Sequence, residues 1–210
     1  MKRIYFLLLT VLISGCIDFR SEYPEIDYYK LTQAPYSIKD IQELDGTLQI
    51  RPFSVSSEYN TSLLLAKWND TRVERYYYHR WITSPAEMVT DFFVQRFSEI
   101  KAFKGGILKP TTLMIPDYVL EGQVLEMAAV NSEGNKQGDN YVTISIKVLL
   151  IERDPMSTDK SILLSKVYTH KIDRRNNEAV SIPGAFSKAF SFAADGMMAD
   201  IQKAVKESRK

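Results

Sequence analysis

Ser84-Pro85-Ala86-Glu87-Met88-Val89 begins the stretch that decides the fold, because three helix-start features agree there. Ser84 can accept a hydrogen bond from a free backbone amide, Pro85 suits the first helical position, and Glu87 completes a capping box. Apolar residues then recur at helical spacing, at Met88, Val89, Phe92, Phe93, Phe97 and Ile100. We therefore predict an amphipathic helix that begins at Pro85 and is ended by Gly105-Gly106.

A second amphipathic helix is predicted from Ile182 onward. Its apolar residues form one continuous stripe: Phe186, Ala189, Phe190, Ala193, Ala194, Met197, Met198, Ile201, Ala204 and Val205. The alanines in this stripe allow a helix to lie close to a sheet. The basic end from Lys203 to Lys210 suits the negative end of a helix dipole.

Strand patterns fill most of the remaining chain. Alternating apolar and polar residues predict a three-stranded meander over 118–129, 141–151 and 162–172, with a bulge expected at Gly122. Shorter strands are predicted in 26–31, 47–53, 63–66 and 72–81, the last two joined as a hairpin at Asn69-Asp70-Thr71. The predicted fold class is α+β: a two-layer sandwich with a mainly antiparallel sheet and both helices on one face.

The N-terminal residues have the pattern of an export signal. Lys2 and Arg3 precede an almost unbroken apolar run from Ile4 to Ile13, which has the length of a signal-peptide core. The run is shorter than the roughly 20 residues that span a bilayer. An uncleaved signal anchor is the alternative, and it would need a longer apolar segment than the sequence before Asp18 provides.

Ile13-Ser14-Gly15-Cys16 resembles the bacterial lipobox, and Cys16 is the only cysteine of the chain. In lipobox proteins the cysteine thiol receives a diacylglycerol, cleavage occurs before the cysteine, and the new amine is acylated. Two or three acyl chains hold a protein on a membrane durably, because each buried CH₂ contributes about 0.8 kcal/mol. We therefore expect a lipoprotein signal peptide over 1–15, a tether over 16–25 and a single domain over 26–210.

Composition excludes several classes of partner and bond. The formal net charge is +1, so a general attraction to nucleic acid is not expected. With Cys16 acylated no thiol remains to form a disulfide, and the hydrophobic core must carry the stability of the domain.

No catalytic or metal-binding pattern stands out. His79 and His170 are far apart in strand-like segments, and no histidine, cysteine or acidic spacing suits zinc. The sequence has no Gly-x-Ser-x-Gly nucleophile motif. We expect no enzymatic activity, no metal and no cofactor other than the lipid on Cys16.

The aromatic run from Tyr76 to Trp81 is the remaining candidate site. Tyr, Trp and Arg dominate binding hot spots, so Tyr77, His79, Arg80 and Trp81 are candidate residues for a protein contact. The alternation leaves open whether Tyr77, His79 and Trp81 or Tyr76, Tyr78 and Arg80 point outward.

Taken together, these features resemble the ABC-type transport auxiliary lipoproteins, the PqiC-like lipoproteins associated with MCE transport systems. The resemblance spans nearly the whole mature chain. It is carried by the lipobox, Tyr28-Tyr29-x-Leu31, Leu48-x-Ile50-x-Pro52-Phe53, the run 76–81 leading into Pro85, Tyr118-Val119-Leu120-Glu121-Gly122 and the terminal helix. The chain departs from the family at Leu63-Leu64-Leu65-Ala66-Lys67-Trp68, where the family more often has a tyrosine.

The resemblance implies a non-catalytic adaptor on the periplasmic face of a bacterial membrane. Its partners would be an MCE-domain protein and ABC transporter components that move lipids or other hydrophobic molecules between membranes. Ile17 is not the aspartate associated with inner-membrane retention, which favours the outer membrane. Aromatic strands and a short tether also suit a ring-shaped homo-oligomer.

Two other functions fit the same anchor. The first is an outer-membrane lipoprotein that assists cell-envelope assembly or activates a wall-building enzyme. The second is a lipid carrier with a cavity of its own, lined by Phe92, Phe97, Phe186 and Phe190.

Overall fold

A computed structural model of the protein describes residues 24–35, 41–68, 71–133, 139–153 and 160–209. The predicted signal peptide, Cys16, most of the tether and the turn residues Asn69 and Asp70 lie outside the described residues.

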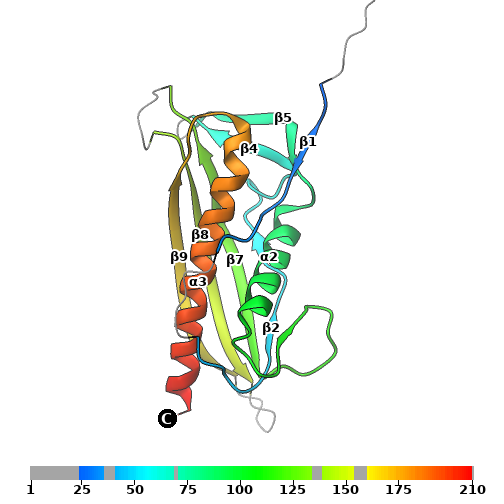
Figure 1. The fold of residues 1–210 in the computed structure, drawn as a ribbon, viewed down its shortest axis with the longest axis vertical. Coiled ribbons are helices and arrows are strands. Elements are labelled where there is room, and N and C mark those ends of the chain that lie inside the picture. Colours follow the sequence, from blue (N-terminus) through cyan, green and yellow to red (C-terminus); the bar gives the residue numbers. More distant parts are fainter. Residues whose placement is uncertain (1–23, 36–40, 69–70, 134–138, 154–159, 210) are drawn as a thin grey trace, which may run out of the picture.

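Within these residues two helices cover one large, open sheet (Figure 1). The strands are β1 (Asp27–Tyr29), β2 (Leu48–Ile50), β3 (Ser54–Val55), β4 (Leu63–Lys67), β5 (Val73–Trp81), β6 (Ile107–Leu108), β7 (Tyr118–Val130), β8 (Tyr141–Arg153) and β9 (Lys160–Asp173). The helices are α2 (Pro85–Ile100), α3 (Ile182–Ser208) and a 3₁₀ turn, η1 (Ala179–Ser181). The prediction of a mixed α+β fold with one sheet and two long helices is confirmed.

Strand β7 is the axis of the sheet. One of its edges pairs antiparallel with β8, which pairs antiparallel with β9, so the predicted meander is present. The other edge of β7 is bordered in turn by β2, β3 and β4, and all three run parallel to it. The sheet is therefore antiparallel in its long ladders, whereas the short pairings of β1 with β5 and of β2 with β6 are also parallel.

The bulge in β7 lies at Leu125, and the prediction of a bulge at Gly122 was wrong. Gly122 pairs in register with Val148, and the register shifts between Val124 and Glu126. Gly122 is needed for another reason: a Cβ there would lie 2.1 Å from Cε1 of Phe53. The Phe53 ring thus packs directly on the β7 backbone, which only glycine permits.

Helix α2 begins as the sequence predicts. The Oγ of Ser84 accepts a hydrogen bond from the Glu87 amide at 3.3 Å, and Pro85 is the first helical residue. The helix ends at Ile100 and not at Gly105-Gly106, because Lys101 takes the left-handed conformation that closes it, with φ of 55°.

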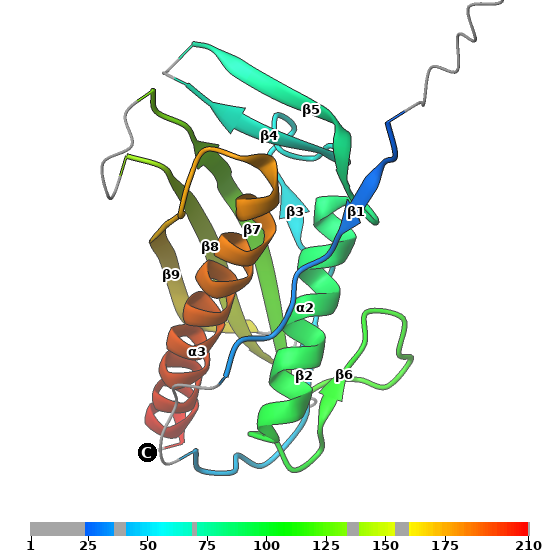
Figure 2. The same ribbon diagram turned by 45° about the horizontal axis from the view of Figure 1, so that its top comes forward.

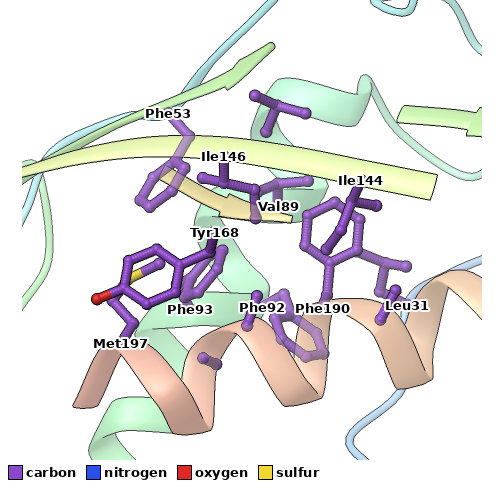
Figure 3. Close-up of a cluster of buried hydrophobic side chains, with 14 of the residues drawn as sticks. Leu31, Phe53, Val89, Phe92, Phe93, Ile144, Ile146, Tyr168, Phe190 and Met197 are labelled. Carbon is purple, nitrogen blue, oxygen red and sulfur yellow. The ribbon is translucent and has the colours of Figure 1, made fainter. Parts of the chain in front are cut away.

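The core forms where α2, α3 and the sheet meet (Figure 3). The ring of Phe93 on α2 stacks on Phe53 with 4.7 Å between centroids, and Phe190 of α3 lies 6.4 Å from Phe93. Ile144 and Ile146 of β8 form the sheet side of this cluster and are fully buried. The predicted apolar stripes of both helices are thus the surfaces that build the core.

One buried ion pair connects the two helices. The guanidinium of Arg96 on α2 is fully buried and donates to Asp195 Oδ1 of α3, with an Nη2 to Oδ1 distance of 2.6 Å. Its Nη1 donates to the carbonyl of Ala34, in the segment that follows β1. Arg96 therefore holds three parts of the chain together at the centre of the domain.

Candidate functional site

The first described residues enter the fold as an edge strand followed by a strap, which we define as residues 31–35. Figures 1 and 2 show this segment running between α2 and α3. The amides of Thr32 and Ala34 donate to the hydroxyls of Ser187 and Ser191 on α3, at 3.0 and 3.2 Å. Because Leu31 is also buried in the core, the strap fixes the C-terminal end of β1.

The inner side of β1 is closed by a small polar cluster. Tyr29 Oη lies 3.0 Å from His79 Nδ1, and Asp27 Oδ2 lies 3.3 Å from the same nitrogen. Burial, followed by the charge of Asp27, raises the pKa of the Tyr29 hydroxyl. The hydroxyl therefore stays protonated at neutral pH. The polar groups of Asp27, Tyr29 and His79 thus interact with one another.

A wide irregularity in β5 decides which rings face outward. Leu63 of β4 is opposite Arg80, whereas the next residue, Leu64, is opposite Tyr76. Residues 77–79 are thus extra on the β5 side of the hairpin, and they change the alternation of its side chains.

As a result, Tyr76 and Trp81 both point inward although they are five residues apart. Tyr76 Oη accepts a hydrogen bond from Asn131 Nδ2 at 2.8 Å. Trp81 is 5% exposed and packs 6.0 Å from the ring of Phe186. Burial is the largest cause of a raised pKa at Tyr76, which keeps this half-buried hydroxyl neutral.

The four predicted contact residues are therefore divided. Tyr77 is 62% exposed and Arg80 is half-buried, with its Nε donating to the carbonyl of Tyr77. His79 is half-buried in the cluster with Tyr29. Selecting Trp81 as a contact residue was wrong, because its ring is part of the core.

Four exposed residues near the start of the domain, together with the half-buried Arg80, form one surface, the outer face, which we define as Ile26, Tyr28, Tyr78, Arg80 and Ile82. Tyr28 is the direct partner of Arg80 in the β1–β5 ladder, and residues two apart on a strand share a face. Tyr28, Tyr78 and Ile82 are 59%, 50% and 64% exposed. The sequence reasoning did not single out Ile26, Tyr28 and Ile82, although 26 and 28 have the alternating spacing of one strand face.

A second exposed apolar feature is the tip of the loop between β6 and β7, which we define as Leu113, Met114 and Ile115. These side chains are 100%, 60% and 77% exposed. The base of the loop is fixed, since Asp117 Oδ2 accepts from the amide of Thr47 at 2.7 Å and from its hydroxyl at 2.8 Å. The tip thus presents three apolar side chains from a rigid base.

An open groove of about 530 Å³ lies where α2 begins, and its lining includes Pro52, Phe53, Glu87 and Asp91. Hydrogen bonds from Thr83 and then Ser84 lower the pKa of Glu87, so the groove is acidic at neutral pH. An acidic groove does not match an anionic ligand.

The four phenylalanines considered for a lipid cavity pack in the core. Phe92 and Phe190 are 6.0 Å apart, and Phe97 is in contact distance of Phe93 at 5.7 Å. Phe186 borders a void of only about 10 Å³ beside Trp81. These four rings are therefore part of the packed core.

No helix among the described residues is long and apolar enough to cross a membrane. No group of three or more histidine, cysteine or acidic side chains in this part of the chain is placed to hold a metal ion. His79 and His170 lie in β5 and β9, and burial lowers the pKa of His170.

Comparison with known proteins identifies a shared fold. No family model matches the chain, and no curated protein matches its sequence. Protein XCC0632 from Xanthomonas campestris, described under the family model DUF330, is similar with a TM-score of 0.73 at 14% identity, over 87% of this chain and 99% of that one. A second solved structure, described as an uncharacterized protein, has a TM-score of 0.65 at 11% identity, over 84% and 99%. The chain therefore has the fold of the DUF330 structure from Xanthomonas.

Proposed function

We propose that the protein is a lipid-anchored, non-catalytic adaptor of an MCE/ABC-type system that transports lipids between membranes. Cys16 carries the acyl chains, and the domain works at the periplasmic face of a bacterial membrane, the outer membrane being favoured. The observation that carries this proposal is the lipobox Ile13-Ser14-Gly15-Cys16 directly behind a basic and apolar export signal.

Two structural features support an adaptor role. The start of the domain is held by the strap, so a pull on the tether is passed to both helices through Ser187, Ser191 and Arg96. The loop tip of Leu113, Met114 and Ile115 offers apolar side chains to a partner, and exposed apolar clusters of this kind mark protein interaction sites. We assign this tip to the contact with the MCE-domain protein.

The anchor is tested with Cys16→Ser in the native host. We expect the variant to lack acyl chains and to keep its signal peptide, as measured by intact-protein mass spectrometry of the membrane fraction. Normal lipoprotein processing of Cys16→Ser would overturn the anchor.

The adaptor role is tested by affinity purification of the acylated protein from detergent-solubilised membranes. We expect an MCE-domain protein to co-purify with the native chain. It should be lost from the double variant Leu113→Ser, Ile115→Ser and kept with Ile162→Ser, a matched control whose side chain is 62% exposed on β9. Recovery of a wall-building enzyme in place of an MCE protein would contradict the proposal and support the cell-envelope alternative.

A further inference from the structure

The outer face lies at the place where the tether meets the domain. Cys16 and Ile26 are ten residues apart, and an extended chain reaches at most about 3.3–3.6 Å per residue, or roughly 35 Å. Ile26 is itself the first residue of the outer face. An acylated Cys16 therefore keeps this surface within a short reach of the bilayer.

The side chains of the outer face have the chemistry of a membrane interface. Tyrosine is enriched where lipid headgroups meet the acyl chains, because its ring is apolar and its hydroxyl remains hydrated. Tyr28 and Tyr78 are exposed rings, and Ile26 and Ile82 add exposed aliphatic groups.

The charges of this surface suit lipid phosphates. Arg80 is the one ionised residue of the five, and Lys30 continues the alternation of β1 and is exposed. The nearest carboxylate on β1, that of Asp27, belongs to the other side of the strand, beside His79. Long basic side chains can extend to headgroups while their neighbours contact apolar surface.

We propose that the outer face of β1 and β5 lies on the bilayer that holds the acylated Cys16, with Tyr28 and Tyr78 at the level of the lipid headgroups. This inference rests on the proposed acylation. The strap fixes β1 against α3, and the inner side of β1 is occupied by the Tyr29–His79 cluster, so docking through this face also sets the orientation of the whole domain.

The test uses the full acylated protein in vesicles of phosphatidylethanolamine and phosphatidylglycerol without any other protein. Since Cys16 is the only natural cysteine and its thiol would be acylated, Tyr28→Cys and Tyr78→Cys each supply a single thiol for a fluorescent label. Val167→Cys is the control, because Val167 is 47% exposed on β9, outside the outer face. Bromine-labelled lipids then report the proximity of each label to the bilayer.

We expect labels at positions 28 and 78 to be quenched at least threefold more than the label at 167. If Tyr28→Cys or Tyr78→Cys fails to fold, a label on Ile82→Cys takes its place, because Ile82 lies beyond the end of β5; we expect this label to be quenched to the same degree. Equal quenching at all positions overturns the inference, as do labels that stay in water in these vesicles and become protected only when a protein partner is added.

Mass spectrometry of the same samples separates the two proposals. If Cys16 carries no acyl chain, the proposed function fails. If Cys16 is acylated and the labels at 28 and 78 remain in water, the proposed anchor stands and only the docking of the outer face is wrong.

Discussion

The core between the two helices and the β1–β5 edge are held in different ways. In the core, the Phe93 ring packs against rings from the connection between β2 and β3, from α2 itself and from α3. Arg96 joins both helices to the strap. At the edge, β1 is a ladder of three residues whose outer side chains are exposed. The core is therefore fixed by contacts within the chain, whereas the outer apolar side chains of the β1–β5 edge remain exposed and available to a surface outside the chain.

The largest expected effect is at the buried ion pair. Arg96→Met should lower the free energy of unfolding by about 3–5 kcal/mol, because the carboxylate of Asp195 is left buried without its guanidinium. Urea unfolding measures this change. Arg51→Met is the control: its pair with Glu121 is exposed, and its loss should cost about 0–1 kcal/mol.

A double variant sharpens this prediction. Arg96→Met combined with Asp195→Leu removes both charges, and we expect it to recover at least half of the lost stability, since a matched apolar pair avoids the cost of burying charge. If the double variant is as unstable as Arg96→Met alone, the loss comes from packing or from the bond to Ala34, and our account of the pair is wrong.

The elements with strong local signals could be predicted from the sequence. Ser84-Pro85-Ala86-Glu87 determines the start of α2 through bonds among neighbouring residues, and the three long strands follow from alternation alone. These features depend on residues close in sequence. The structure has them where the pattern indicates, apart from the end of α2.

Features that depend on distant residues could not be predicted in this way. Gly122 looks like an interruption until Phe53, far away in sequence, is seen to pack on it. Trp81 turns inward because residues 77–79 are extra in the β4–β5 pairing, which no pattern within β5 reveals. The parallel placement of β2, β3 and β4 along β7 likewise requires the tertiary structure.

A medium effect is expected where β7 meets Phe53. Gly122→Ala places a methyl group 2.1 Å from the Phe53 ring and should destabilise the protein by about 1–3 kcal/mol through overpacking. Phe53→Leu in the same chain should reduce this cost, so the two changes are expected to be less than additive in urea unfolding.

Gly184→Ala is the matched control for this site. Among the described residues, no atom other than those of the neighbouring residues and the helix backbone lies within 4 Å of a Cβ added at Gly184 in α3, so alanine there should leave stability unchanged or raise it by up to about 1 kcal/mol. Additive losses from Gly122→Ala and Phe53→Leu would show that the close approach does not explain why position 122 is glycine.

The smallest effect is expected at the edge. Tyr29→Phe removes the hydroxyl beside His79 Nδ1, and a hydrogen bond of this kind contributes about 0.5–1.5 kcal/mol. Because β1 has few other bonds, the loss should appear as local opening. The amide of Ile82 donates to the Tyr29 carbonyl at 2.8 Å, so its hydrogen exchange should become about 2- to 10-fold faster.

Hydrogen exchange also shows whether the β1–β5 edge opens independently of the core. We expect the amide of Ile144 in β8 to keep its native rate in Tyr29→Phe, and Tyr28→Phe to leave both rates unchanged, because Tyr28 is on the outer face. Equal acceleration at Ile82 and Ile144 would mean that β1 opens only when the core unfolds. The edge would then belong to the core, and the contrast between the two regions would be lost.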